Sequence, residues 1–350
     1  MRKYPVVRPS AHAAVATCLM LILLSCAPVL CTASDQISGA EDRSLLAASK
    51  ASLIGPGEDS VERLRIGTFN IRNFPCNNNC ACKEQNRLSE KCARPGKPST
   101  DLRRLADTIG KLKVHILAVN EILNPERLAR FAVERLGPGW KFTCAEEGDP
   151  RRVGFLYDSS TVTLKDHKAY PDIFTSLKPE EHPEGCIRGR RAKLRPAYAC
   201  RFEVKGTPFD FYAVVLHLKS GPCPSIRRAQ WKLMERVVDQ LSKEDEEIIV
   251  LGDFNSFGKT EKDFDEFCRN KHFTLVTGDI PCTHLYGSEG GTTLDNVLVS
   301  RKALDLFLKG SARAGGACGT GCVRNTFWKA YQNLVSDHCP VVVEFRTSIP

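Results

Sequence analysis

The sequence lacks three features that would each point to a particular class of protein: an internal repeat, a Cys-x-x-Cys pair, and a second apolar run that could cross a bilayer. Such a run takes about 18–20 residues, and no run beyond residue 33 reaches that length. The missing Cys-x-x-Cys pairs argue against zinc. Residues 61–350, without repeats or a spanning segment, are long enough to bury a large core as one domain.

The first 33 residues have the pattern of an export signal. Three basic residues fall within the first eight positions, and the apolar run Ala13–Leu24 is too short to span a bilayer. Ordinary cleavage after Ala33 is the favoured interpretation. The alternative is a lipoprotein signal, because residues 23–26 resemble a bacterial lipobox that would place a lipid anchor on Cys26. Both alternatives predict a secreted or extracytoplasmic protein.

Residues 34–60 are rich in Ser, Ala, Gly and acidic residues and show no periodic apolar pattern. This composition predicts a flexible linker before the domain at residues 61–350.

The cysteine content favours disulfide bonds. Thirteen of the sixteen cysteines lie at Cys76 or later, an odd number, so one is unpaired or bonds to Cys31. In an exported chain the expectation is a disulfide network. The spacing of Cys318 with Cys322, like that of Cys76 with Cys80, would also suit zinc, which is the less favoured alternative.

Two short motifs adjoin strongly apolar stretches. Gly-Asp-Phe-Asn at residues 252–255 follows the run 248–251, and Ser-Asp-His at residues 336–338 precedes the run 340–343. Apolar runs rich in β-branched residues are typical of buried strands. Charged groups at the ends of buried strands are costly unless they are paired or bind a metal. The pattern therefore predicts a hydrolytic site at one edge of a sheet.

Four further apolar segments carry a polar residue at one end. They end in Asn70, Glu121 and His217, and the fourth begins with Asp295. A single such residue is usually a turn former. The same coincidence in six segments makes that explanation improbable for the whole set.

In this order the motifs resemble the endonuclease/exonuclease/phosphatase superfamily, which includes deoxyribonuclease I, abasic-site endonucleases, sphingomyelinases and inositol-polyphosphate phosphatases. The resemblance covers about residues 62–347 and rests on Phe-Asn, Asn-Glu, Leu-His, Gly-Asp-Phe-Asn and Ser-Asp-His in sequence. It implies an α/β fold, a four-layer sandwich of two packed mixed β-sheets, each of six strands, flanked by helices. The active site would lie along one edge formed by strand ends.

The apolar patterns locate most of these elements. Strands are predicted at residues 64–70, 114–120, 152–157, 197–204, 209–217, 247–252, 294–299 and 340–346. Helices are predicted at residues 101–112, 125–136 and 226–241, the second because Asn124 caps it and Pro125 begins it.

The strand-end residues suit metal-dependent cleavage of a phosphodiester. Magnesium prefers one or two carboxylates with waters and substrate oxygens, which makes Glu121 the best candidate for the main metal ligand. The resemblance implies that Asn70 and Asp337 support the ion. Mg²⁺ is the expected metal, with Ca²⁺ or Mn²⁺ as alternatives.

The remaining site residues are assigned by chemistry together with the resemblance. His338 is expected beside the phosphate, oriented by Asp295, because a carboxylate raises the basicity of an imidazole and fixes its tautomer. Asp253 would position or deprotonate the water, and Asn255 would donate to a phosphoryl oxygen. His217 matches the second histidine of deoxyribonuclease-like members, which helps to protonate the leaving group. His167, His182, His272 and His284 lack motif context and are expected on the surface.

The chain departs from the family pattern at two places. Deoxyribonuclease-like members usually carry a supporting glutamate just before the strand at 153–157, where residues 149–152 read Asp-Pro-Arg-Arg. This departure predicts that His217 lacks its usual partner. Arg72 stands where abasic-site endonucleases place a metal-binding acid, which disfavours abasic-site repair.

The formal net charge of +9 suits a polyanionic or membrane-surface partner. Arg190 and Arg191 lie in a basic segment, and Arg195-Pro196 resembles a family element whose arginine reaches a phosphate. All three arginines are predicted to bind the substrate phosphates.

A second basic group follows the His217 strand. Arg227, Arg228 and Lys232 begin the helix predicted at residues 226–241, whose apolar stripe would leave these basic residues exposed near the site.

These observations favour a monomeric, secreted deoxyribonuclease I-like endonuclease that cleaves DNA. A phosphatase or sphingomyelinase-type phospholipase C of the same fold is the alternative. Residues 255–257 read Asn-Ser-Phe instead of Asn-(Phe/Tyr)-Arg, which disfavours an inositol phosphatase. A catalytically inactive binding protein is the third alternative, against which the complete set of polar site residues argues.

Overall fold

The computed structural model describes residues 62–77, 99–146, 150–171, 194–257, 262–284, 291–323 and 325–348. The predicted signal segment with Cys26, the predicted linker, and Arg190 and Arg191 lie outside these residues.

The described residues form twelve strands in two sheets. The strands are β1 (Arg63–Phe74), β2 (Ile116–Ile122), β3 (Trp140–Cys144), β4 (Arg152–Asp158), β5 (Val162–Tyr170), β6 (Ala197–Val204), β7 (Asp210–His217), β8 (Ile248–Asp253), β9 (Phe273–Leu275), β10 (Asp295–Ser300), β11 (Arg313–Ala314) and β12 (Val341–Arg346). One six-stranded sheet has the order β11-β12-β1-β2-β4-β3, and the other has the order β5-β6-β7-β8-β10-β9.

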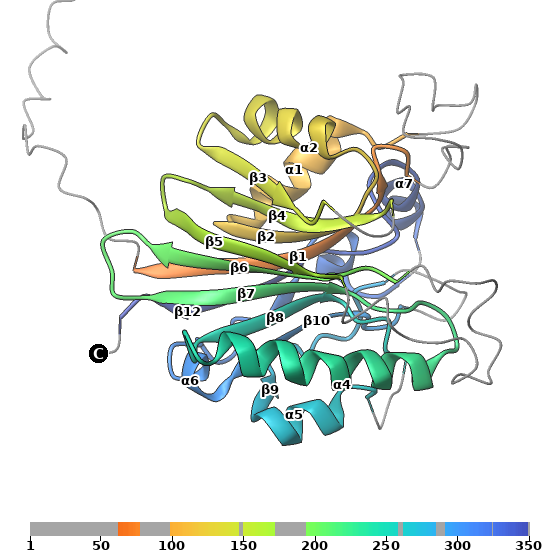
Figure 1. Cartoon of the computed structure of the whole chain (residues 1–350). Helices are drawn as coiled ribbons and strands as arrows, with labels where there is room; N and C mark the ends of the chain where they lie inside the picture. The colour runs from red at the N-terminus through yellow and green to blue at the C-terminus, as the bar shows by residue number, and fades with distance from the viewer. Residues whose placement is uncertain are drawn as a thin grey trace, which may run out of the picture. The chain divides into compact units, whose positions relative to one another are not determined.

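Helices cover the outer face of each sheet (Figure 1). They are α1 (Leu102–Leu112), α2 (Pro125–Phe131) with its π-helical extension η2 (Ala132–Leu136), α4 (Pro224–Leu241), α5 (Asp265–Lys271), α6 (Arg301–Leu304), the 3-10 turn η4 (Gly316–Thr320) and α7 (Thr326–Leu334). The helices α1, α2 and α7 lie over the first sheet, while α4 and α5 lie over the second. The predicted four-layer α/β sandwich is confirmed.

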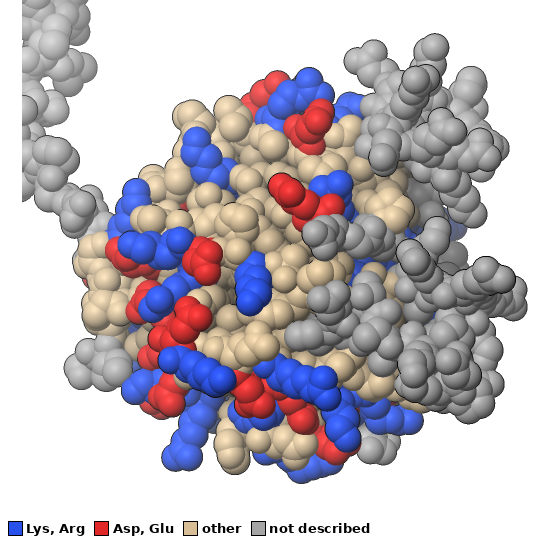
Figure 2. Space-filling view, viewed as in Figure 1, with Lys and Arg blue, Asp and Glu red and all other residues tan. Residues whose placement is uncertain are grey.

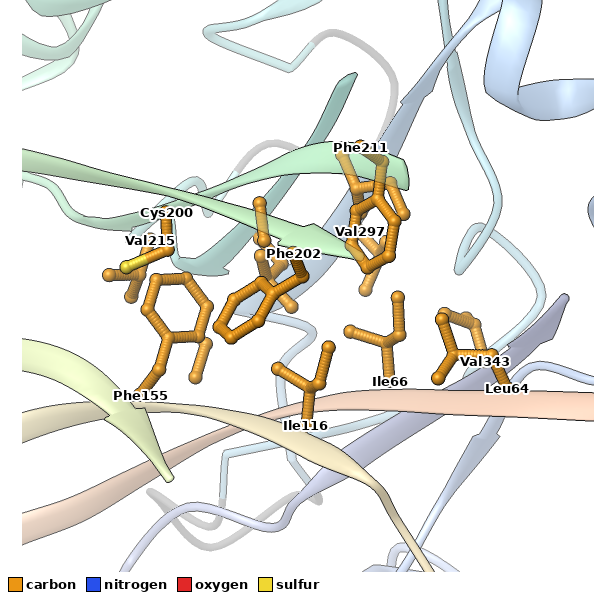
Figure 3. Close-up of a cluster of buried hydrophobic side chains, with 14 of the residues drawn as sticks. Leu64, Ile66, Ile116, Phe155, Cys200, Phe202, Phe211, Val215, Val297 and Val343 are labelled. Carbon is orange, nitrogen blue, oxygen red and sulfur yellow. The ribbon is translucent and has the colours of Figure 1, made fainter. Parts of the chain in front are cut away.

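The core between the sheets is apolar and aromatic (Figure 3). Ile66 and Ile116 of the first sheet face Phe202 and Phe211 of the second, and all four side chains are fully buried. Phe155 meets Phe202 edge to face, with ring centroids 5.7 Å apart. This packing between the sheets, at about 25 cal/mol per Å² of apolar area buried, keeps the two sheets face to face.

Two parallel strand pairs bring the polar strand ends to one edge. In the pair β1–β2, Asn70 lies opposite Asn120, and in the pair β7–β8, His217 lies opposite Asp253. The antiparallel pair β8–β10 then places Asp295 opposite Asp253. Strands that are parallel end at the same edge of a sheet, so the register itself gathers these residues.

All eight predicted strands form, with ends shifted by up to four residues. The predicted helix at residues 226–241 is α4, and its apolar stripe is buried. The predicted helix at 125–136 changes from α-helical to π-helical geometry after Phe131. The pattern missed the four edge strands β3, β5, β9 and β11, which are short or partly exposed, and the short helices α5, α6 and α7.

Two disulfides are present among the described residues. Cys282 bonds to Cys322 and Cys318 bonds to Cys339. Cys318 and Cys322, one of the two pairs weighed for zinc because of their spacing, therefore belong to different disulfides. Cys80, Cys82 and Cys92 lie outside the described residues.

None of the helices in the described ranges is long and apolar enough to cross a membrane. On the face shown in Figure 2, basic and acidic side chains of the described residues are interspersed. The net positive charge is therefore not gathered into a single basic patch among the described residues of that face.

Candidate active site

The site lies where β1, β2, β7 and β8 end and where β10 and β12 begin. Gly252, just before Asp253 in β8, has a φ of 138°, and a Cβ at this position would overlap the backbone oxygen of Leu216. The close approach of β7 to β8 therefore requires glycine here. This is a physical reason for the glycine in the Gly-Asp-Phe-Asn motif.

A chain of polar contacts joins four of the predicted residues. His338 Nδ1 lies 2.7 Å from Asp295 Oδ2, and His338 Nε2 lies 3.8 Å from Asp253 Oδ2. Asn70 Nδ2 donates to Asp253 Oδ2 at 3.0 Å. All four side chains are buried, with at most 6% of each residue exposed. The structure therefore brings together residues that lie up to 268 positions apart in the chain.

Burial and charge shift the pKa values of this cluster in opposite directions. Burial alone would lower the pKa of His338, but the carboxylates of Asp295 and Asp253 outweigh it and raise that pKa to about 10. Burial raises the pKa of Asp253 above its ordinary range, the positive charge of His338 opposes the rise, and the Asp295 carboxylate adds to it. His338 is therefore positively charged near neutral pH, and Asp253 is a stronger base than an exposed aspartate.

Local contacts support the orientation of His338. Ser336 Oγ donates to the backbone oxygen of Asn70 at 2.7 Å and accepts from the backbone N–H of His338 at 3.1 Å. The backbone N–H of Asp295 donates to Thr283 Oγ1 at 2.9 Å. The serine of the Ser-Asp-His motif thus ties β1 to the histidine it precedes.

Glu121 and His217 form the second part of the site. Glu121 Oε2 accepts from the backbone N–H of Asn73 at 3.0 Å, and Glu121 Oε1 lies 3.8 Å from His217 Nε2. His217 Nε2 also lies 3.5 Å from Asp253 Oδ2. Glu121 has a φ of 61°, a left-handed conformation that is uncommon for residues other than glycine and frequent at functional sites.

His217 is held neutral. Burial lowers its pKa well below the ordinary value, and the neighbouring Arg195 and Arg151 lower it further. Its Nδ1 is buried and has no hydrogen-bond partner among the described residues.

Arg72 holds the two predicted supporting metal ligands. Its backbone N–H donates to Asn70 Oδ1 at 3.0 Å, and its Nε lies 3.1 Å from Asp337 Oδ2. The guanidinium also donates to the backbone oxygen of Gln332 at 2.8 Å. Asp337 is therefore ion-paired with Arg72, a contact that the sequence does not indicate.

His284, expected on the surface, belongs to the site instead. Its ring centroid lies 4.5 Å from that of His338, and a β-bridge joins the two backbones. Burial lowers the pKa of His284 to about 3, and the charge of His338 contributes. The sequence-based expectation was wrong because His284 follows no long apolar run and reaches the site through an isolated bridge. His167 and His272 are exposed, as predicted.

The basic residues near the site differ in how far they are exposed. Arg227 is only 3% exposed, and its guanidinium bonds to Asp263 and to the backbone oxygens of Lys219 and Gly221. The expectation that Arg227 is exposed was wrong, because its side chain turns back under the loop that follows β7. Arg228 and Lys232 are exposed, as predicted. Arg195 is 3% exposed and lies close enough to His217 to lower its pKa.

Asn255 completes the set of predicted residues. Its backbone N–H donates to Asp253 Oδ1 at 3.0 Å, and its Nδ2 donates to the backbone oxygen of Leu218 at 3.2 Å. Its φ of 51° is left-handed, a conformation that asparagine tolerates better than most residues. This turn directs the Asn255 side chain toward the loop after β7.

The donor set is chemically suited to a divalent cation. Carboxylate oxygens of Asp253 and Asp295 lie within 4.8 Å of each other, and the Glu121 carboxylate lies beside His217 at the same edge. Burial is the main cause of the raised pKa of Asp253, and the Asp295 and Glu121 carboxylates add to it, against the opposing charge of His338. A hard cation with oxygen ligands would balance the charge of these carboxylates.

Comparison with known proteins identifies the family of the chain and agrees with its fold. A family model described as "Endonuclease/Exonuclease/phosphatase family" matches residues 67–338. The human Nocturnin catalytic domain with a bound sulfate anion is similar at 16% identity and a TM-score of 0.55, over 83% of this chain and 96% of that chain.

Two further solved structures have the same fold. A family protein from Bacteroides thetaiotaomicron is 16% identical, with a TM-score of 0.53 over 82% of this chain and 98% of that chain. D. rerio TDP2 complexed with single strand DNA product is 12% identical, with a TM-score of 0.52 over 82% of this chain and 100% of that chain. No curated protein matches the chain.

Proposed function

Because the chain belongs to the endonuclease/exonuclease/phosphatase family, we propose that it is a secreted, divalent-metal-dependent phosphodiesterase that cleaves nucleic acid, in the manner of deoxyribonuclease I. The observation that carries the proposal is the buried cluster of Asn70, Asp253, Asp295 and His338. A cluster of two carboxylates and an imidazolium is costly to bury, and it suits a site that binds and cleaves a phosphoester.

The reaction is an in-line displacement at phosphorus. A water oxygen forms the new P–O bond while the P–O bond to the leaving group breaks, and negative charge builds up on the phosphoryl oxygens. Asp253 takes the proton of the attacking water, because its raised pKa makes it a stronger base than an ordinary aspartate. His338 presents its positive charge to the phosphoryl oxygens.

The leaving oxygen must receive a proton, either from a protonated side chain or from a water molecule at the site. His338 carries such a proton near neutral pH, whereas neutral His217 is a much weaker acid. Asn255 keeps one amide hydrogen after bonding Leu218 and can donate it to a phosphoryl oxygen. Asp295 holds the tautomer and orientation of His338 through the 2.7 Å contact.

Glu121 is the proposed principal ligand of the metal, with Asn70 and Asp337 as supporting ligands. A divalent ion supplies charge neutralisation at the phosphoryl oxygens. The Glu121 carboxylate is the one that suits this role best, because Oε1 bears no hydrogen bond among the described contacts and the side chain is 15% exposed. Asp337 is ion-paired with Arg72, and this pairing weakens its contribution to binding the metal.

The substrate is proposed to be nucleic acid, with DNA favoured. Arg195 lies at the site, and Arg190 and Arg191 are proposed to contact phosphates on either side of the cleaved bond. The D. rerio TDP2 structure, of the same fold, contains a single-strand DNA product. Several simultaneous phosphate contacts would give binding that weakens steeply as salt rises.

The test is a substrate panel with purified mature protein and Mg²⁺, Ca²⁺, Mn²⁺ or chelator. The panel comprises plasmid, linear DNA, RNA, sphingomyelin vesicles, inositol phosphates and a phosphate monoester. We expect plasmid and linear DNA to be cleaved with a divalent ion only, and KM for DNA to rise steeply between about 50 and 200 mM salt. Hydrolysis of sphingomyelin or a monoester with intact DNA and RNA would favour the phospholipase or phosphatase alternative. No hydrolysis in any arm would favour the inactive binding protein.

A further inference from the structure

Phe257 is an exposed aromatic residue at the rim of the site. It follows Asn255 by two positions and is 45% exposed, whereas the nearby Phe254 is fully buried. Phe254 packs edge to face against Trp231, with ring centroids 4.9 Å apart. The loop after β8 therefore buries one phenylalanine and presents the next one to solvent.

The Phe257 ring lies over a fixed cation. The guanidinium carbon of Arg227 lies 5.8 Å from the ring centroid, within the range of a cation–π contact. Arg227 itself cannot move freely, because it bonds to Asp263, to the Lys219 oxygen at 3.0 Å and to the Gly221 oxygen at 2.7 Å. One face of the ring is thus supported by a buried, anchored charge.

The same arginine joins the two loops that carry the site. Lys219 and Gly221 follow His217, and Asp263 ends the loop that follows Asn255. Ser256, which is 1% exposed, accepts from the backbone N–H of Asp263 at 3.2 Å. The backbone immediately before Phe257 is therefore held at a defined place relative to the site residues.

We propose that Phe257 is a stacking platform for one nucleobase of a single-stranded nucleic-acid segment, next to the phosphate that is cleaved. This inference rests on the proposed function and deepens it. An aromatic side chain accepts any base, because every base has a π-face, whereas a base inside a duplex is already stacked on its neighbours. The platform therefore favours strands whose bases are unpaired.

The reach of the chain agrees with this placement. Two residues span at most about 7 Å, and successive phosphates along a stacked strand are about 3.4 Å apart along the axis. A phosphate held at Asn255 would consequently place a base within one or two nucleotides of Phe257. Arg228 is exposed, and its guanidinium lies 3.8 Å from Asp263, the carboxylate that also binds Arg227.

The other large exposed apolar residues among those described do not share these features. Val133, Val323 and Phe327 are exposed, and isolated apolar residues on a surface are ordinary. Phe327 lies on α7, where its ring centroid is 6.5 Å from that of Tyr331, and it makes no cation–π contact with any described residue. It is a matched control, because it is a phenylalanine of similar exposure (51%) outside the proposed machinery.

The experiment compares Phe257→Ala, Phe257→Trp and Phe327→Ala on two oligonucleotides of equal length, one with bases and one abasic. We expect Phe257→Ala to raise KM for the base-bearing strand about tenfold, with kcat within about twofold. KM for the abasic strand should stay unchanged in every variant. Phe257→Trp should restore the wild-type KM, and Phe327→Ala should resemble wild type in all arms.

A binding measurement separates this inference from the proposed function. Fluorescence anisotropy with the His338→Ala protein, with and without Phe257→Ala, reports base binding without turnover. If wild type cleaves both strands with equal KM, or if Phe257→Ala changes neither KM nor anisotropy, the platform is wrong while the nuclease function stands. If the wild-type protein neither cleaves nor binds either strand, both the stacking platform and the nuclease function are wrong. If Phe257→Ala weakens binding to sphingomyelin vesicles and leaves oligonucleotide binding unchanged, Phe257 contacts lipid and the platform is rejected.

Discussion

His338 and Asp295 lie 43 residues apart in the chain, and their side chains meet at 2.7 Å in a fully buried contact. The contact forms because β10 begins at Asp295 in one sheet while the Ser-Asp-His segment leads into β12 of the other. It therefore couples the two sheets at the site. Burial alone would lower the pKa of His338, and the Asp295 carboxylate is the strongest of the groups that raise it.

Replacing His338 by alanine tests the proposed role of this charge. Loss of one group that stabilises transition-state charge typically costs about 10²- to 10³-fold in kcat. We expect His338→Ala to lose this much while KM changes little, measured by initial rates on DNA. The control is Asp295→Asn, which should lose less because the imidazole remains. A His338→Ala protein that keeps more than about a tenth of the wild-type rate would show that another group faces the phosphate.

The proposed metal ligand gives a second prediction. Glu121→Gln keeps the size of the side chain but removes the negative charge that a divalent cation prefers. We expect the Mg²⁺ concentration for half-maximal activity to rise at least about tenfold, with partial recovery of the rate at saturating metal. Titration of the rate against metal concentration, and calorimetric titration of the metal without substrate, measure the shift. Wild-type activity that persists in chelator would contradict the metal dependence itself.

His284 is predicted to position His338. Its ring packs on that of His338 at a centroid distance of 4.5 Å, so an alanine would leave one face of His338 uncovered. We expect His284→Ala to lower kcat about tenfold with KM nearly unchanged, a loss smaller than that of His338→Ala. His284→Phe should recover most of the rate, because an aromatic ring restores the packing. Equal losses in the Ala and Phe variants would instead indicate that His284 contacts the substrate through its nitrogens.

The two disulfides are predicted to stabilise the segment that bears Thr283, His284 and the Ser-Asp-His motif. They close loops of 40 and 21 residues, for which the chain-entropy model gives about 3–4 kcal/mol each. We expect the paired replacements Cys282→Ser/Cys322→Ser and Cys318→Ser/Cys339→Ser each to lower the midpoint of thermal unfolding. Cys268, a half-buried free thiol, provides the control replacement Cys268→Ser. Equal midpoints in all three variants would reject the stabilising role.

Glu344 on β12 gives a prediction about pH. Burial alone would raise its pKa, but hydrogen bonds and ion pairs from Arg313 and Arg65 lower it below 4.5. A lowered pKa in the folded state means that the stabilisation is present above the unfolded pKa and is lost as pH falls through the folded value. Glu344→Gln should therefore lower the free energy of unfolding at pH 7 by at most about 1 kcal/mol, because the contact is partly solvated. The difference between the two proteins should shrink as pH falls through the lowered pKa of Glu344; a difference that stays constant across the acidic range would contradict the charge-based explanation.

The strands and the site residues were largely predictable from local pattern. Continuous apolar runs mark strands buried on both faces, and β1, β7, β8, β10 and β12 are of that kind. Because each run is continuous, the polar residue at its end could be recognised in the sequence. By contrast, β3 and β5 lie at sheet edges with partly exposed side chains, so their residues carry no comparable apolar signal.

What the sequence determined by itself is the set of buried strands and the polar residue that ends each of them, because strand burial depends on side-chain hydrophobicity within a short window. Only the tertiary structure decided which of these residues touch. The register of β8 against β7 and β10 places His217 and Asp295 on either side of Asp253. His284 beside His338, Arg72 paired with Asp337, and Arg227 beneath Phe257 all depend on loops and bridges between distant segments. Such contacts depend on the tertiary arrangement of the backbone, which a local pattern of residue types does not specify.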